Sequence, residues 1–545
     1  EVKVPDTLKD LEQLGRNLWW TWQPKAIALF SSIDEEVWDA VGHNPIALFA
    51  ALSYDRFLEL EKNKKFMGAL KDIVDEFKAY MAKKRKASEP KIAYLCMEYG
   101  LHESLPIYSG GLGILAGDYL KEASDQNTDL TAFGMLYRYG YFTQRFNMHG
   151  DQVAHYEKQH FTELPITPVK DAHGKRLLLQ MPLRGPMIHV QVWKVAVGRV
   201  NLYLFDTDIP ENSDENKRIT HHLYGGDWEN RFRQELLLAV NAVQLIETLQ
   251  LKFDLYHYNE GHTAFTALVR GLRLVAKENL SFEEAGHLVK ASTLFTTHTP
   301  VPAGHDSFSE DLLRSYQSHY AETLNISWER LLALGRIHAT DKLEKFSMSY
   351  LAARMSGEIN SVSKIHEGVT REMFKPLWKG IPKEELEIGH VTNGVHLPSW
   401  TAPEWQDLFT ETFGAEFWQD QSNGNHWKKI GEVPAKKIIE TKKILKKQLI
   451  KGIEKRVEGR SVPKLLSESL NGFDENHLII GFARRFATYK RADLLFRDTE
   501  RLARLVNVPE RPVKFLFAGK AHPADKAGQD IVKRIIELSR TPEFL

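Results

Sequence analysis

At 545 residues the chain is too long for a single hydrophobic core, and a typical domain size of roughly 150 residues predicts two to four domains. The 72 basic and 72 acidic residues balance, which excludes a strong overall field toward nucleic acid or an anionic membrane. A hydrophobic content of 43% and an aromatic content of 11% are typical of an ordinary globular protein.

The single cysteine, Cys96, permits no intramolecular disulfide, which favours a reducing cytoplasm. It lies in the apolar run 92–97, so we expect a buried strand residue rather than a reactive nucleophile. The first residues show no signal-peptide pattern, and no run of 18 apolar residues occurs. These features predict a cytoplasmic location, with no membrane and no nucleic-acid partner.

The first 90 residues are predicted to form a helical N-terminal domain. Apolar residues recur at three- and four-residue spacing over 10–22 and again over 46–81. The pattern ends at Ser88-Glu89-Pro90, because proline cannot continue a helix. We therefore place the first domain boundary after residue 90.

From residue 91 to 458 strands alternate with helices, which predicts a parallel sheet covered by helices. Helices are expected up to about residue 126, over 230–249, and from Ser281, which begins a capping-box pattern. The two strands around Gly198-Arg199 suggest a hairpin. The predicted strands are 91–97, 130–137, 176–181, 188–197, 200–205, 255–258 and 291–297.

A long lysine-rich helix is predicted over 436–457, and alternation resumes after residue 459. Strands are expected at 477–483 and 513–517, with helices at 493–505 and 529–538. Two such units are too few to bury both faces of a parallel sheet, so 459–545 is interpreted as an incomplete doubly wound domain. The predicted fold class is α/β.

A glycine-rich turn, residues 109–118, lies between a predicted strand and a predicted helix. Glycines let backbone amides approach a ligand, and a helix N-terminus favours negative charge, so this turn is a candidate phosphate site. The spacing Gly111-x-Gly113-x-x-Ala116 also fits a relaxed dinucleotide pattern, but the next strand ends in Arg138 where that pattern has an acid. A turn with no ligand remains an alternative.

Two polar segments follow predicted strands, 257–263 and 296–302. Polar groups at the carboxyl end of a parallel strand face the ligand crevice of an open α/β sheet. For His257 and His262 the rival interpretation is a metal site, although their spacing does not suit one helical face and no second cysteine exists. For His298 the rival is a purely structural histidine.

Four cations occur within residues 484–491 with no carboxylate among them, directly after a predicted strand. Arginine offers bidentate donors and lysine a point charge, so this cluster suits phosphate. A solvated surface turn is the alternative.

Taken in order, these segments resemble the α-glucan phosphorylases (glycogen, starch and maltodextrin phosphorylases). The resemblance extends from about residue 92 to the end of the sequence. Residues 17–22 and 42–45 resemble the extra helical domain of a bacterial and archaeal branch of this family. The segment 298–306 resembles the enzymes of that branch more than the animal enzymes. The segments that carry the resemblance are 110–113, 259–262, 297–299, 360–366, 392–394, 489–491 and 519–523.

The resemblance implies a GT-B architecture of two Rossmann-like domains with the site between them. It also implies reversible, retaining phosphorolysis of α-1,4-glucan, with glucan and inorganic phosphate or glucose 1-phosphate as partners. It places His298 at the glucose 6-hydroxyl, Arg485 and Lys490 on the substrate phosphate, and Arg484 near a cofactor phosphate. The residues implied in binding substrate are Gly110, Gly111, Leu112, Glu260, His262 and Asn393, and those implied in catalysis are His298, Arg485 and Lys490.

One departure concerns the cofactor. Family members carry pyridoxal 5′-phosphate on a lysine in a Gly-Thr-x-x-Met-Lys type of segment, and this sequence contains no such segment. We expect that lysine beyond residue 545, so that the chain is truncated and inactive alone.

Two other functions remain open. A nucleotide-sugar-dependent glucan synthase of the same GT-B shape would have a lysine where Tyr108 stands, before Ser109 and the glycines. A non-catalytic glucan-binding fragment is the second alternative. A homo-oligomer is compatible with the sequence.

Overall fold

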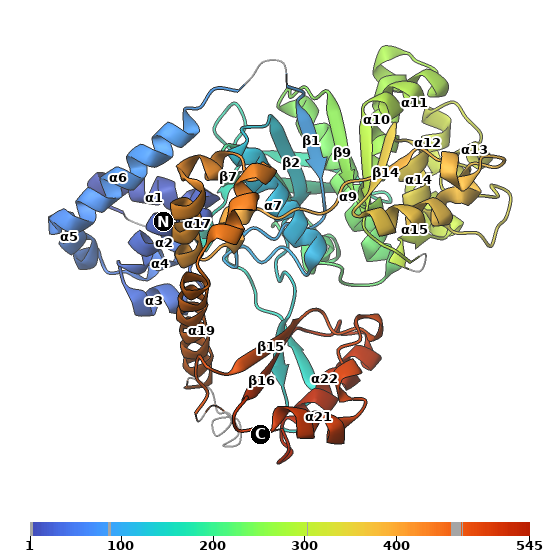
Figure 1. Cartoon of the computed structure of the whole chain (residues 1–545). Coiled ribbons are helices and arrows are strands. Elements are labelled where there is room, and N and C mark those ends of the chain that lie inside the picture. Colours follow the sequence, from blue (N-terminus) through green and yellow to red (C-terminus); the bar gives the residue numbers. More distant parts are fainter. Residues whose placement is uncertain (1–3, 86–88, 302–303, 459–469, 471, 545) are drawn as a thin grey trace. The chain divides into compact units, whose positions relative to one another are not determined.

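The computed structural model describes residues 4–85, 89–301, 304–458, 470 and 472–544. Contacts between residues divide the chain into two compact units (Figure 1). Unit 1 consists of residues 1–141 and 158–400, and unit 2 of residues 142–157 and 401–545. This division differs from the predicted boundaries at 90 and 458. The contacts group the first helices with the main sheet, and residues 401–458 with the C-terminal strands.

The main sheet of unit 1 has ten described strands in the order β14-β13-β10-β9-β1-β2-β8-β7-β5, with β6 also paired to β7. Neighbours are parallel from β14 to β8, and β7 is antiparallel to β8, β6 and β5. The predicted hairpin is therefore confirmed as β7–β8. The strands are β1 (Ile92–Leu95), β2 (Leu130–Met135), β5 (Thr167–Pro168), β6 (Leu178–Pro182), β7 (Met187–Val197), β8 (Val200–Asp206), β9 (Leu255–Asn259), β10 (Thr293–Thr297), β13 (Glu358–Ser361) and β14 (Ile388–His390).

The strand order reverses between β1 and β9. From β1 the chain adds β2 and β8 on one side, whereas β9, β10, β13 and β14 follow one another on the other side. In open α/β sheets such a switch point leaves a crevice at the carboxyl ends of the two strands. The segments that follow β1, β9 and β10 therefore lie where a ligand is expected.

Helices cover this sheet, and the contacts place α7 (Gly111–Asp125) and α9 (Trp228–Thr248) against β2 (Figure 1). The capping box predicted at Ser281 is present: its hydroxyl accepts the Glu284 N–H, and the Glu284 carboxylate accepts the Ser281 N–H. The other elements of this part are α8 (Asp214–Lys217), α10 (Phe265–Glu278), α11 (Phe282–Ala291), α12 (Glu310–Thr323), α13 (Trp328–Leu332), α14 (Met348–Arg354), α15 (Lys364–Phe374), α16 (Leu397–Trp400) and the pair β11 (Ser307–Phe308) and β12 (Phe346–Ser347).

The N-terminal segment is helical, as predicted, but the pattern over 46–81 is divided among three helices. The Ser53 hydroxyl accepts the Arg56 N–H and the Asn63 side chain accepts the Phe66 N–H, so each begins a new helix. The helices are α1 (Lys9–Arg16), α2 (Pro24–Ser31), α3 (Glu35–Ala40), α4 (Pro45–Ala51), α5 (Tyr54–Lys62) and α6 (Lys64–Met81).

These N-terminal helices share one hydrophobic core with the sheet. Leu11 and Leu14 of α1 are fully buried in the same cluster as Val195 of β7. The Asn17 side chain also accepts the Gly198 N–H at 2.8 Å and donates to its carbonyl at 3.0 Å. Because this packing joins the first helices to the sheet, residues 1–90 do not form a compact unit of their own.

Unit 2 is built on two parallel strands, β15 (Leu478–Ala483) and β16 (Val513–Ala518). The helix predicted over 493–505 is interrupted, because the Asp498 carboxylate accepts the Arg501 N–H and starts α21 (Thr499–Val506) after a single 3-10 turn, Leu494–Phe496. The remaining elements are the hairpin β3 (Thr143–Phe146) and β4 (Gln152–His155), and the helices α17 (Pro403–Phe413), α18 (Gly424–Lys428), α19 (Ala435–Glu458) and α22 (Lys526–Leu538).

The β3–β4 hairpin belongs to unit 2 although it lies far away in the sequence. The Gln152 amide donates to the Ala521 carbonyl at 2.8 Å, and Lys533 forms an ion pair with Asp151 at 2.8 Å. The predicted α/β class is confirmed, since both units combine parallel strands with helices. Among the described helices, none is both long and apolar enough to cross a membrane.

Candidate functional site

The switch point of unit 1 is held together by polar side chains from β1, β9 and β10. The Met97 N–H donates to His262 Nε2 at 3.2 Å, and the Asn259 amide donates to Cys96 Sγ at 3.1 Å. His298 Nε2 lies 2.5 Å from Asn259 Oδ1. The two polar segments that the sequence placed at strand ends are thus in direct contact. Cys96 is buried, as predicted, and burial raises its pKa to about 12.

Glu260 fixes the turn that carries His298. Its carboxylate accepts the N–H groups of His298 and Thr299 at 3.0 Å each and the Thr299 hydroxyl at 2.9 Å. Burial opposes its ionisation, but the His298 and His305 imidazoles and the backbone donors outweigh burial and lower the pKa of Glu260. Its φ of 74° is rare for a residue other than glycine. The carboxylate is committed to protein groups, so its direct role is to hold the turn.

Burial is the main influence on the pKa of both His262 and His298. Burial lowers the pKa of His262 to about 3, and burial also lowers the pKa of the half-buried His298. His262 uses Nε2 to accept from Met97 and is fully enclosed. His298 donates through Nε2 to the Asn259 oxygen, which leaves Nδ1 as an acceptor.

His257 forms a structural link across three strands. Its Nε2 lies 2.8 Å from Thr296 Oγ1, which donates to Asn360 Oδ1 at 2.6 Å. Burial lowers the pKa of His257 to about 3. Nε2 of each ring is thus occupied by a protein group, Thr296 of β10 for His257 and the N–H of Met97, just after β1, for His262.

The glycines of the turn at the start of α7 have different surroundings. A Cβ atom at Gly113 would lie 2.6 Å from Glu98 Oε2, so a side chain at that position would not fit. A Cβ at Gly110 or Gly111 would meet nothing within 4 Å. No side chain of the described residues caps this helix. The side-chain positions of Gly110 and Gly111 are therefore open at the positive end of a helix, next to the half-buried Leu112, while the Gly110 N–H interacts with the Glu98 carboxylate.

Glu98 holds this turn in place through its buried carboxylate. This role of Glu98 was not predicted from the sequence. Its Oε2 accepts the Ser109 N–H at 2.8 Å, and its Oε1 accepts the Tyr224 hydroxyl at 2.5 Å. Burial raises the pKa of Glu98. The available signal was an acidic residue directly after the buried strand 92–97, at the position where ligand-facing polar groups are expected.

Asn393 lies at the carboxyl end of the same sheet, beyond β14. Its N–H donates to the Val362 carbonyl at 3.2 Å, which fixes it beside the end of β13. The side chain is exposed. Unit 1 thus brings the ends of β1, β9, β10 and β14 to one edge of the sheet, together with the predicted substrate residues that follow them.

The predicted phosphate residues Arg484, Arg485 and Lys490 belong to unit 2 and follow β15. Both arginines are exposed, and among the described residues none of the three forms an ion pair. A Cβ at Gly519 would lie 2.1 Å from the Arg484 carbonyl oxygen, so the segments after β15 and β16 touch only because glycine stands there. The loop therefore presents unpaired positive charge at the carboxyl end of its two strands.

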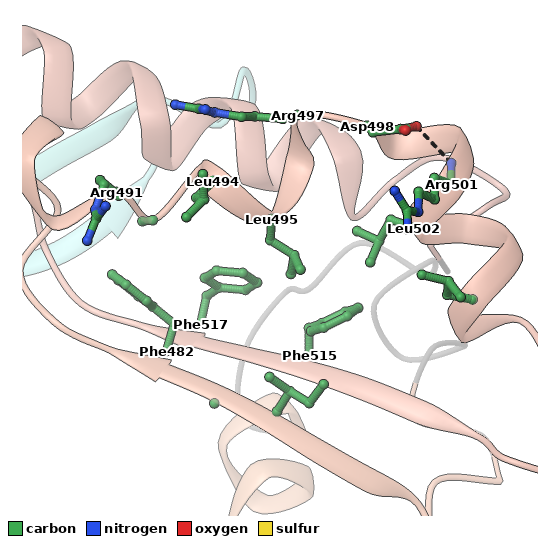
Figure 2. A pocket seen from close by; sticks show the side chains of 14 residues that line it. Phe482, Arg491, Leu494, Leu495, Arg497, Asp498, Arg501, Leu502, Phe515 and Phe517 are labelled. Carbon is green, nitrogen blue, oxygen red and sulfur yellow. Dashed lines mark hydrogen bonds between the residues drawn. The ribbon is translucent and has the colours of Figure 1, made fainter.

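Unit 2 also contains a pocket of about 590 Å³ on one face of β15 and β16. Figure 2 shows Phe482, Phe515 and Phe517 on the strands opposite Leu494 and Leu495. The lining is mostly apolar, and Arg484, Arg485 and Lys490 do not line it. This pocket is an open apolar hollow, since Leu494 and Leu505 of its lining are exposed, and the cations of 484–490 do not line it.

Comparison with known proteins gives two family matches. A family model described as carbohydrate phosphorylase matches residues 210–542. A second model, described as a protein of unknown function (DUF3417), matches residues 4–105 and so covers the N-terminal helices.

Curated relatives align with nearly the whole chain. The chain is 40% identical to the maltodextrin phosphorylase of Thermococcus litoralis over 99% of its own length, and 36% identical to the glycogen phosphorylase of Mycobacterium tuberculosis, also over 99%. It is 36% identical to the glycogen phosphorylase of Aquifex aeolicus over 98%. The chain spans 65% of the length of the first two relatives and 77% of the third.

Proposed function

The chain belongs to the carbohydrate phosphorylase family, and on that premise we propose that it carries the glucan- and phosphate-binding residues of an α-1,4-glucan phosphorylase. The proposed reaction is reversible, retaining phosphorolysis, in which phosphate oxygen replaces the glycosidic oxygen and glucose 1-phosphate leaves. The names of the relatives, maltodextrin and glycogen phosphorylase, support a glucose polymer as the substrate.

The observation that carries the proposal is the edge of the unit 1 sheet, where the first turn of α7 follows β1 and His298 follows β10. Nδ1 of His298 is free to accept a hydrogen bond from a sugar hydroxyl, because Nε2 is occupied by Asn259. The amides of Gly111 and Leu112 would donate to sugar or phosphate oxygens, whereas the Gly110 amide already interacts with the Glu98 carboxylate. Asn393, with its exposed amide, would hold another hydroxyl. Glu260 and His262 act indirectly, by fixing His298 and the strand ends.

The cation cluster of unit 2 supplies the other chemical requirement. As the glycosidic bond breaks, positive charge develops at the anomeric carbon, and a nearby phosphate stabilises that charge. The phosphate itself needs fixed cations. Arg485 and Lys490 are proposed to hold it, with the bidentate guanidinium setting its orientation.

The cofactor of the family, pyridoxal 5′-phosphate, is part of the proposal. Arg484 fits a second phosphate group, because it is exposed and forms no ion pair with a described residue. The cofactor would supply an anionic phosphate beside the substrate phosphate. The single cysteine supports a cytoplasmic setting for this chemistry.

Release of glucose 1-phosphate from maltodextrin and inorganic phosphate tests the proposal, with and without added pyridoxal 5′-phosphate. Phosphate-dependent release supports it. Chain elongation from ADP-glucose with no response to phosphate would identify a nucleotide-sugar synthase instead. Retardation of the chain in a glucan-containing gel, with neither reaction, would identify a glucan-binding fragment.

The phosphate role of Lys490 is tested separately by Lys490→Ala, in a chain that shows turnover. We expect the KM for phosphate to rise at least tenfold, because a fixed cation on the phosphate is removed. Lys443→Ala on α19 is the matched control, since it removes an exposed charge of unit 2 away from the cluster. Equal phosphate kinetics in the two variants would refute the assignment.

A further inference from the structure

A chain of buried polar contacts begins at Glu98, below the glycine turn of α7. The Glu98 carboxylate holds the Ser109 N–H on one side and the Tyr224 hydroxyl on the other. Tyr224 has a φ of 54°, in the left-handed region that non-glycine residues rarely adopt. The Arg231 guanidinium lies over its ring, 4.4 Å from the centroid. Tyr224 is thus held between the carboxylate and the cation.

From Arg231 the series of side-chain contacts continues to Asp306, in the segment that follows β10. Arg231 Nη2 lies 2.7 Å from Asp306 Oδ2, and Arg231 Nε lies 3.2 Å from Glu235 Oε1. The Arg231 side chain is only 13% exposed, and that of Asp306 is 18% exposed. Asp306 also accepts the Met348 N–H through its backbone carbonyl. His305, the neighbour of Asp306, has Nε2 at 3.1 Å from the Thr299 carbonyl oxygen, so these contacts connect the residues next to His298 with the turn that carries Gly111.

The charged groups in this series of contacts are the Arg231 guanidinium and its two carboxylate neighbours, Glu235 and Asp306. Burial and the neighbouring Asp306 raise the pKa of Glu235. Burial opposes the ionisation of Asp306, but Arg231 outweighs it and lowers the pKa of Asp306. Arg231 and Asp306 form the shorter of the two ion pairs, at 2.7 Å, and loss of Asp306 would leave Arg231 with only its contact to Glu235 at 3.2 Å.

We propose that Glu98, Tyr224, Arg231 and Asp306 are positioning residues that couple the glycine turn of α7 to the segment after β10. A sugar bound by the turn amides and by His298 then meets both contacts in one fixed geometry. The inference rests on the proposed function for the identity of the bound sugar, whereas the coupling itself is a property of unit 1.

Tyr224→Phe removes only the Tyr224 hydroxyl, which donates to the Glu98 carboxylate. Tyr316→Phe is the matched control, because its hydroxyl donates to Glu229 at 2.5 Å and Arg233 lies 5.7 Å from its ring, outside this chain of contacts. We expect both variants to lower the Tm by similar amounts. Only Tyr224→Phe should raise the KM for maltoheptaose in the synthesis or phosphorolysis direction, by about fivefold or more, with kcat less affected. Equal kinetics in the two variants would overturn the proposal.

Amide hydrogen exchange tests the coupling without any turnover. Asp306→Asn should speed exchange at the Ser109 amide, which donates to Glu98, by about tenfold relative to wild type and to Tyr316→Phe. Unchanged exchange at Ser109 would overturn the coupling. If wild type shows no phosphorolysis while Ser109 exchange responds as expected, the proposed function fails and the coupling stands.

Discussion

At the scale of single residues, two glycines in one turn have separate roles. A Cβ at Gly113 would lie 2.6 Å from Glu98 Oε2 and 2.7 Å from Tyr108 Cβ, whereas one at Gly111 would meet nothing within 4 Å. Gly113 is required by packing inside the protein. Gly111 is not, which leaves its open surroundings available to a ligand.

Gly113→Ala should therefore lower the free energy of unfolding by roughly 1–3 kcal/mol, the usual cost of overpacking. Gly111→Ala should leave stability within about 0.5 kcal/mol, as for surface substitutions, while weakening sugar or phosphate binding. Chemical denaturation and ligand titration of both variants measure these effects. Equal stability losses in the two variants would contradict the assignment.

Glu260 gives a pH-dependent prediction at the same scale. Its folded-state pKa is lowered, so its contribution to stability is present above the unfolded pKa of about 4.3 and is lost as the pH falls through the folded value. Glu260→Gln should cost about 2–3 kcal/mol near pH 7, because a charged acceptor of two backbone N–H groups is lost.

The stability difference between wild type and Glu260→Gln should then shrink below about pH 4. Denaturation curves at pH 7, 5 and 3.5 give this difference directly. A difference that stays constant down to pH 3.5 would show that the ionised carboxylate is not the source of the stabilisation.

At the scale of elements, Asn17 joins a helical segment to the β7–β8 hairpin. It caps the 3-10 turn Leu18–Trp22 through the Trp19 N–H, and it bonds both backbone groups of Gly198, whose φ is 56°. Asn63, in contrast, only caps α6. A comparison of variants at the two asparagines therefore distinguishes the stability that comes from capping from the stability that comes from the contact with the hairpin.

Asn63→Ala should cost about 1 kcal/mol, the usual value of a lost N-cap. Asn17→Ala should cost about 2 kcal/mol more, because two buried backbone groups at Gly198 also lose their partner. Thermal and denaturant unfolding of both variants provides the measurement. Similar costs would mean that the hairpin contact contributes no net stability.

At the scale of the whole molecule, the N-terminal helices belong to the core of unit 1. Leu8, Leu11, Leu14 and Leu18 are fully buried in the cluster that includes the sheet. Removal of residues 1–84 would expose that surface of the sheet, and an exposed apolar surface of this kind promotes aggregation. The truncated chain is therefore expected to lose cooperative unfolding and to aggregate.

Co-expression of residues 1–84 as a separate chain is the control, and it should restore solubility. Circular dichroism and size-exclusion chromatography distinguish the outcomes. A soluble truncated chain with a cooperative transition would support the boundary predicted at residue 90.

The sequence by itself determined the α/β class, most strands, and the placement of the polar segments at strand ends. Hydrophobic periodicity and caps such as Ser281–Glu284 act over a few residues, so they can be read locally. The division of the 46–81 pattern into separate helices was not predicted, although a local signal was present, since Ser53 and Asn63 are typical N-caps. The candidate segments 257–263 and 296–302 could be predicted to lie together because parallel strands end at one edge of a sheet.

Only the tertiary structure decided the unit boundaries, the internal use of the Glu260 carboxylate and the support of the glycine turn by Glu98. Each depends on partners distant in the sequence: Asn17 with Gly198, Glu260 with His298, and Glu98 with Tyr224. Strand order and side-chain packing bring such pairs together, and neither is written in local periodicity. The same reason explains why two glycines of one motif, alike in the sequence, differ in what a side chain there would meet.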